Sequence, residues 1–269
     1  MKKNKWLAIS IFSAKRNWPF LLKNGVHPLI DQLTNNNEII SFNLQFNDTN
    51  SEHIRLALLA PGDLAYKVAK KADICFKELF KENELSLASR SDSLNQLFVP
   101  YLKHKLHYDL YSTTILPVSG VLLTLQQGLS WSMLEAFSDG AFIDNDLILT
   151  FCLHILFSCY KVIPESERVL YVKEYLSRHD IGYYFFYFKY NATAIGEIYN
   201  DVMNPLAENP AIWLNKWEEA FKRMYAVASD NSQQLIYFNQ AVNFIQLQLR
   251  LSAFSMVFLN FCILKTLSA

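Results

Sequence analysis

Glycine and proline are scarce in this chain, with 7 and 8 copies among 269 residues. Folds built of many short strands need frequent tight turns, which are rich in glycine and proline. The scarcity of these two residues therefore favours long helices over a sandwich or barrel. Charge of one sign is also lacking, because 25 basic side chains are matched by 25 acidic ones. Proteins that bind nucleic acids use an excess of lysine and arginine to neutralise phosphates. We therefore expect no nucleic-acid partner.

Cysteine is rare, and its four copies form no Cys-x-x-Cys pair. The longest apolar runs, 147–160 and 253–264, are shorter than the about 20 residues that span a bilayer. Near the N-terminus, Lys15 and Arg16 interrupt the apolar segment before a signal peptide could form. We expect a cytoplasmic protein without a membrane anchor. Three cysteines lie inside apolar runs, as small buried side chains do: Cys152, Cys159 and Cys262.

Hydrophobic residues are abundant, at 51% of the chain, and their spacing changes along it from strand-like to helical. The predicted strands are 6–13, 38–46, 53–59 and 101–113, of which the second and third form a hairpin. The predicted helices are 18–33, 64–80, 118–137, 145–162, 165–179, 183–203, 211–228 and 233–266. The polar segment 82–95 is predicted to be a mobile loop.

This order of elements predicts an α+β fold that is predominantly helical. A small antiparallel sheet at the N-terminal side would pack on a multi-helix body. We expect a single domain, 1–269, with a sheet-containing part at 1–115 and a helical part at 116–269.

No familiar catalytic or cofactor motif is present in the sequence, whether for dinucleotides, phosphates, zinc proteases or serine hydrolases. His104 and His107 are three residues apart, which on the predicted strand turns them to opposite faces. We expect no metal and no cofactor. An aromatic run at 183–190 has two interpretations: a buried helix whose tyrosine hydroxyls reach its edges, or a pocket wall for a flat, dehydrated substrate.

Two neighbouring segments resemble a known family. The stretch Ser-Phe-Asn-Leu-Gln-Phe-Asn-Asp at 41–48, followed by Glu-His-Ile-Arg-Leu-Ala-Leu at 52–58, resembles the Phe-Phe-Ile-Arg-Tyr, then His-Leu-Arg-Leu-Arg, signature of the thiopeptide-type bacteriocin biosynthesis family. This family includes the C-terminal glutamate-elimination domain of lantibiotic dehydratases and free-standing pyridine synthases of thiopeptide pathways. The opening strand with Trp6, the helix near Val26 to Ile30 and the late Leu259-Asn260 pair agree with the resemblance.

The chain departs from the eliminating members of that family. Of the paired arginines in the signature only Arg55 remains, because Gln45 and Ala57 stand at the other positions. Those members carry an Arg-Tyr-Gly-Gly motif, whereas the corresponding segment here, 115–120, has no arginine. They also carry a His-x-His-Leu-Asn-Arg motif, whereas the corresponding segment here, 256–261, has neither histidine nor arginine. The resemblance therefore implies a pyridine synthase, which joins two dehydroalanines of a precursor peptide by a formal aza-(4+2) cycloaddition and then loses water and the leader peptide.

Cycloaddition asks the protein mainly to hold and align two dehydroalanines and to polarise an amide. We expect catalytic roles for Arg55, Ser255 and Tyr184, and substrate contacts from His53, Tyr183 and Asn260. The expected partner is the modified precursor peptide, both leader and core, together with other enzymes of the pathway. Two alternatives remain open: a glutamate-elimination lyase with a shifted active site, and a non-catalytic subunit that binds the precursor.

Overall fold

A computed structural model describes residues 3–47, 52–82, 106–109, 118–138, 140, 143–204 and 211–268. The contacts within the chain divide it into two compact units. The sheet unit comprises 1–119, 133–144 and 248–250, and the helical unit comprises 120–132, 145–247 and 251–269. The predicted fold class, α+β and mainly helical with a small antiparallel sheet near the N-terminus, is confirmed. The expectation of one domain stays a prediction.

The sheet has four strands in the order β2-β3-β1-β4, and the described pairs are all antiparallel. The strands are β1 (Lys5–Phe12), β2 (Ser41–Asn47), β3 (His53–Ala60) and β4 (Leu106–Asp109). The predicted hairpin is confirmed, because β2 and β3 pair directly. Of the predicted fourth strand at 101–113, only the β4 residues are described, and the predicted loop at 82–95 lies outside the described residues from position 83 onward.

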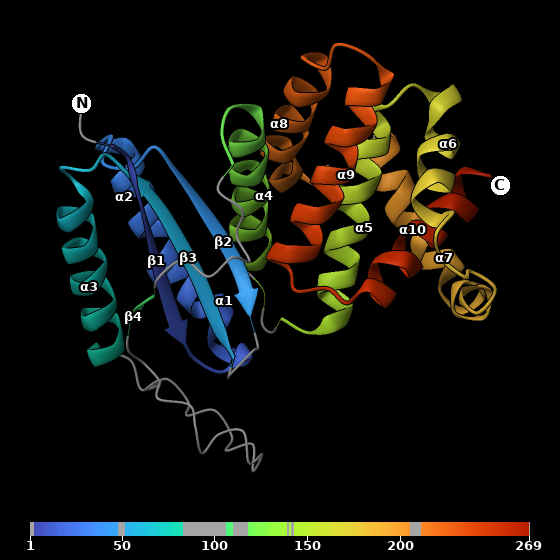
Figure 1. Cartoon of the computed structure of the whole chain (residues 1–269). Coiled ribbons are helices and arrows are strands. Elements are labelled where there is room, and N and C mark those ends of the chain that lie inside the picture. The colour runs from blue at the N-terminus through green and yellow to red at the C-terminus, as the bar shows by residue number, and fades with distance from the viewer. Residues whose placement is uncertain are drawn as a thin grey trace. The chain divides into compact units, whose positions relative to one another are not determined.

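Helices cover the apolar face of this sheet (Figure 1). The Trp18 ring stacks on Phe46 of β2, with centroids 4.8 Å apart, and the Tyr108 hydroxyl of β4 donates to the Ala69 carbonyl oxygen at 3.0 Å. A side chain at Gly25 would begin only 2.8 Å from the Phe76 ring, so glycine allows these helices to approach closely. The helical segments are η1 (Lys15–Asn17), α1 (Trp18–Leu21), the π-helix η2 (Leu22–Val26), α2 (His27–Asn35) and α3 (Ala65–Glu82).

A buried carboxylate links the approach to β2 with helix α3. Glu38 is almost completely buried and lies 2.8 Å from the Lys67 ammonium and 2.7 Å from that of Lys71. Hydrogen bonds from Lys67 and then Lys71 lower the pKa of Glu38 below its ordinary value of 4.5, although burial opposes the shift. The charged form of Glu38 therefore stabilises the fold.

We expect Glu38→Gln to lower the free energy of unfolding by about 1–2 kcal/mol at pH 7, because both lysines are partly exposed and solvent screens the pairs. A lowered carboxyl pKa contributes stability above the unfolded-state value, and this contribution is lost as the pH falls through the folded-state value. The difference between wild type and variant should thus be full at pH 7 and shrink below about pH 4.5. Urea unfolding at several pH values measures it. Asp73→Asn, which breaks an exposed pair with Lys77, is the control and should cost less than about 0.5 kcal/mol.

The helical unit has α5 packed against α7 and α8, and α10 packed against α5, α6 and α7. Large aromatic side chains such as Tyr160, Trp217 and Phe238 are fully buried in it. Its elements lie within a few residues of the predicted ones, apart from the last. They are α4 (Val121–Ser138, shared with the sheet unit), α5 (Asn145–Val162), α6 (Glu165–Leu176), α7 (Tyr184–Met203), η4 (Ile212–Leu214), α8 (Asn215–Ala226), α9 (Asn231–Gln248) and α10 (Ala253–Leu267).

The prediction of one helix at 233–266 is wrong, because the helix is interrupted between Gln248, the end of α9, and Ala253, the start of α10. Arg250 has a φ of 58°, a left-handed conformation that ends a helix. Ser252 then starts α10, its hydroxyl accepting a hydrogen bond from the Ser255 backbone N–H at 3.0 Å. The apolar spacing continues through this break and no glycine or proline marks it, so the sequence pattern shows one helix where the structure has two.

Helix α5 is long and strongly apolar. Among the described residues it is the one helix long and apolar enough to cross a membrane by length and composition. More than half of it, 56%, is buried inside the protein, as in a core helix. Cys152 and Cys159 on this helix are buried, as the sequence predicted.

Candidate functional site

One face of the sheet is lined with polar side chains although most of it is buried. Successive residues of a strand point to opposite faces. On β2 the apolar residues Phe42, Leu44 and Phe46 therefore share one face, and the polar residues between them share the other. The pairing register extends this second face over all four strands. We call it the polar sheet face, and its polar residues with described side chains are Ser10, Ser41, Asn43, Gln45, Asn47, His53, Arg55 and His107.

The polar sheet face is organised in cross-strand rows. Gln45 of β2 pairs with Arg55 of β3, which pairs with Ser10 of β1, which pairs with His107 of β4. In the neighbouring row, Asn47 pairs with His53. Directly opposed residues have Cβ atoms about 4.5–5.5 Å apart, so adjacent members of a row can touch a common ligand group.

A phenylalanine separates the two histidines of this face. The Phe12 ring is stacked on His53 with centroids 4.5 Å apart, and it meets His107 edge-on at 5.3 Å. Stacking holds the His53 ring flat against an apolar neighbour. His53 and Arg55 are two positions apart on β3, so their side chains point to the same face of the sheet. The face therefore combines one guanidinium, two imidazoles and several neutral amides and hydroxyls among its described residues.

Two of the residues predicted from the sequence, His53 and Arg55, are brought together on this face. The sequence reasoning did not select Ser10, Asn43, Asn47 or His107 as site residues, and noted Gln45 only as a departure from the family signature. A signal was present in β2, where polar residues alternate with Phe42, Leu44 and Phe46 in a strand that is buried on both faces. Such alternation normally marks a solvent-exposed face, so burial could not be inferred from it.

The other four predicted residues lie in the helical unit. Ser255 has a capping role, because its backbone N–H and hydroxyl both contact the Ser252 hydroxyl. Asn260 is fully buried and donates to the Met256 carbonyl at 2.9 Å, and the Tyr160 hydroxyl donates to its side-chain oxygen at 3.4 Å. These contacts give the side chains of Ser255 and Asn260 a structural role. The catalytic role of Ser255 and the binding role of Asn260 stay predictions.

The aromatic run of α7 is mostly exposed, so its interpretation as a buried helix is wrong. Tyr184 is buried against Phe254 of α10, with ring centroids 5.0 Å apart, but Tyr183 is 62% exposed. The hydroxyl groups of Tyr183 and Tyr187 form a hydrogen bond at 2.9 Å. The exposed members of the run are Tyr183, Phe185, Phe186, Tyr187 and Tyr190. Such a surface leaves Tyr183 able to contact a partner, whereas Tyr184 serves the packing of α7 on α10.

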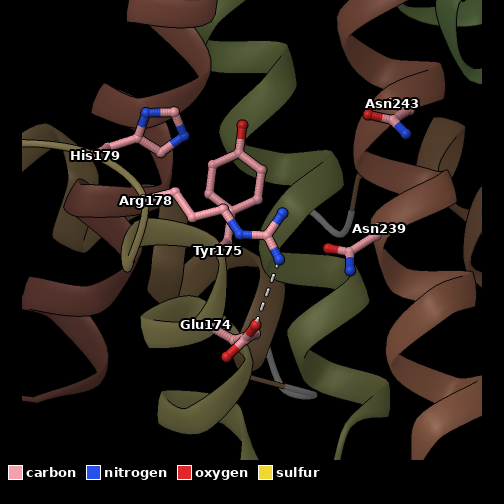
Figure 2. Close-up of a pocket in the computed structure, with 6 residues that line it drawn as sticks. All are labelled: Glu174, Tyr175, Arg178, His179, Asn239 and Asn243. Atoms are coloured by element: carbon pink, nitrogen blue, oxygen red, sulfur yellow. Dashed lines mark ion pairs between the residues drawn. The ribbon is translucent and has the colours of Figure 1, made fainter.

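A pocket lies in the helical unit, where α6 and the residues after it meet α9 (Figure 2). Its volume is about 270 Å³. Figure 2 shows Arg178 reaching toward Glu174, and the two form an ion pair at 3.9 Å. Burial raises the pKa of Tyr175, which keeps its hydroxyl protonated. The remaining lining residues are His179, Asn239 and Asn243.

This pocket is a weaker candidate than the polar sheet face. Arg178 and Glu174 are mostly exposed, so water screens their charges, which also offset each other. Basic residues near the end of a helix are favoured by its dipole, which explains Arg178 and His179 without catalysis. In the part of the chain that the structure describes, no group of three or more His, Cys, Asp or Glu side chains could hold a metal ion.

Comparison with known proteins identifies this fold. No protein-family model matches the chain, and no curated protein matches its sequence. Among solved structures, TbtD, the pyridine synthase from thiomuracin biosynthesis, is similar with a TM-score of 0.67 over 98% of both chains, at 11% identity.

Two further structures share the fold. MibB, a tRNA-dependent lantibiotic dehydratase from Microbispora sp. 107891, matches with a TM-score of 0.61 over 98% of this chain and 28% of its own, at 10% identity. TsrL matches with a TM-score of 0.58 over 98% of this chain and 94% of its own, at 10% identity. The resemblance seen in residues 41–58 is thus confirmed at the level of the fold.

Proposed function

We propose that this protein, which shares its fold with a thiopeptide pyridine synthase, is a maturation enzyme for a ribosomally made peptide. Its reaction would be a formal aza-(4+2) cycloaddition between two dehydroalanines of one precursor peptide. Loss of water and release of the leader peptide as a carboxamide would then leave a pyridine ring in the core peptide. Leader and core would both bind the protein, in the cytoplasm, after other enzymes of the pathway had dehydrated the precursor.

One observation carries this proposal: the polar sheet face offers a mainly neutral set of hydrogen-bonding groups. An enzyme that eliminates glutamate must bind the carboxylate of the leaving glutamate tightly, and paired arginines are suited to this. On this face Gln45 lies opposite Arg55, and Ala57 is two positions further along β3, so the described face has one guanidinium where the signature has a pair. Neutral amides suit a substrate whose reacting groups are alkenes and amides.

The face can supply the electrostatic part of the reaction. The Arg55 guanidinium would donate to the carbonyl oxygen of the reacting amide and favour its iminol form. His53 would contact the substrate beside it. In the helical unit, Tyr183 would offer an exposed aromatic surface to the planar azoles of the peptide. Tyr184, Ser255 and Asn260 remain proposed site residues without a contact that favours them.

Mass spectrometry of the protein incubated with a leader-bearing peptide tests the reaction. The peptide contains two dehydroalanines and thiazoles. We expect loss of water together with release of the leader as a carboxamide. A matched peptide in which one dehydroalanine is replaced by alanine cannot form the ring and should keep its mass.

Two other results would replace the proposal. If the didehydroalanine peptide stays intact while a glutamylated peptide loses glutamate, the protein is an elimination lyase. If both peptides stay intact while the leader binds, the protein is a non-catalytic subunit that binds the precursor.

A further inference from the structure

Asn43 is a buried polar side chain that the fold itself does not explain. It lies in the middle of β2 with 0% of its side chain exposed. Among the described residues, neither its amide nitrogen nor its amide oxygen has a hydrogen-bond partner. Burying an amide without partners costs free energy, and asparagine is also disfavoured in strands. Both local preference and the energetics of the free protein therefore oppose this residue at this position.

The side chains next to Asn43 in its cross-strand row are small. Its partner across the β2–β3 pair is Ala57, and the next residue in the same row, on β1, is Ala8. Both are buried alanines with only a methyl group above the strand. The adjacent row begins with Gln45 and Arg55, so the two alanines lie in the row next to that of Arg55. Asn43 lies beside them on β2, the outer strand of the sheet.

We infer that Asn43 binds the backbone N–H and C=O of one residue in an extended segment of the peptide substrate. In an extended chain these two groups of one residue point the same way. A carboxamide presents an acceptor and a donor side by side, which matches that pair. This inference rests on the proposed function for the identity of the peptide. It means that the peptide backbone is bound by a residue outside the arginine positions of the family signature.

The test uses Asn43→Leu, which keeps the shape of the side chain and removes both polar atoms. Binding is measured by fluorescence anisotropy with a labelled, leader-bearing peptide that contains two dehydroalanines and thiazoles. Loss of two hydrogen bonds should weaken binding about 30-fold. The thermal midpoint of the free protein should stay the same or rise, because an unpartnered buried amide has been removed. This opposite response of binding and stability is the expected signature of a ligand-binding asparagine.

Asn24→Leu is the matched control. Asn24 is an exposed asparagine of η2, outside the polar sheet face, and its side-chain amide donates to the Phe20 carbonyl oxygen at 3.0 Å. We expect this variant to bind the peptide as wild type does. Asn43→Ala serves as a second variant if leucine disturbs the packing.

Each outcome has a clear meaning. If both Asn43 variants bind like wild type, or if both lower the thermal midpoint by several degrees, the inference is overturned. If wild type binds the peptide without converting it, the cycloaddition proposal fails, and the comparison of affinities still decides the role of Asn43. Absence of binding by wild type would overturn both.

Discussion

Arg55→Ala is expected to lower kcat/KM for the didehydroalanine peptide by about 100-fold or more. Arg55 is the one arginine in the described rows of the polar sheet face, placed between Gln45 and Ser10. A donor aimed at the oxygen of the reacting amide stabilises the charge that develops there, and no neighbour in its row carries a permanent positive charge. Mass-spectrometric rates at subsaturating peptide measure the effect.

Two variants separate this role from a general effect of charge. Arg55→Lys keeps the charge but loses the planar fork of donors, so we expect it to recover only a small part of the lost rate. Arg16→Ala removes an exposed arginine of the same unit and should leave the rate unchanged. If Arg55 served only the fold, Arg55→Ala would lower the thermal midpoint while the folded protein kept its rate, and the catalytic assignment would be withdrawn.

Much of the fold could be predicted because the period of hydrophobic residues differs between strands and helices. The alternation in β1 and the long apolar spacing in α5 each select one kind of element. The break at Arg250 could not be predicted, because a left-handed arginine is stabilised by its surroundings rather than by its own preference. Local sequence gave no sign of it.

The candidate site could be predicted only in part. His53 and Arg55 lie within a short segment with a family signature, so sequence similarity was enough to find them. Ser10 joins them by pairing with Arg55 across 45 residues of chain, and His107 joins them by pairing with Ser10 across 97 residues. Only the register reveals this. Asn43 was missed for a different reason: polar residues in an alternating strand are expected to face water, and its burial is a tertiary property.

Trp18→Ala is expected to lower the free energy of unfolding by about 3–5 kcal/mol. Trp18 is 1% exposed, its indole N–H donates to the Ser13 carbonyl oxygen at 3.1 Å, and its ring stacks on Phe46. Phe46 in turn meets the Phe137 ring edge-on at 5.2 Å. Truncation would leave a cavity beneath β2 that its neighbours cannot fill without moving the strand. Urea unfolding followed by circular dichroism measures the loss.

Two comparisons identify the source of that loss. Trp18→Phe keeps a ring against Phe46 but loses the hydrogen bond to Ser13, so it should cost about 1–2 kcal/mol. Tyr66→Ala removes an aromatic side chain of α3 that is 81% exposed and should cost less than about 0.5 kcal/mol. A loss below about 1 kcal/mol for Trp18→Ala would contradict the packing described for β2. Because Phe46 and Gln45 are adjacent on this strand, the same packing fixes which way the polar sheet face points. The stability of the apolar face and the arrangement of the candidate site therefore depend on one strand.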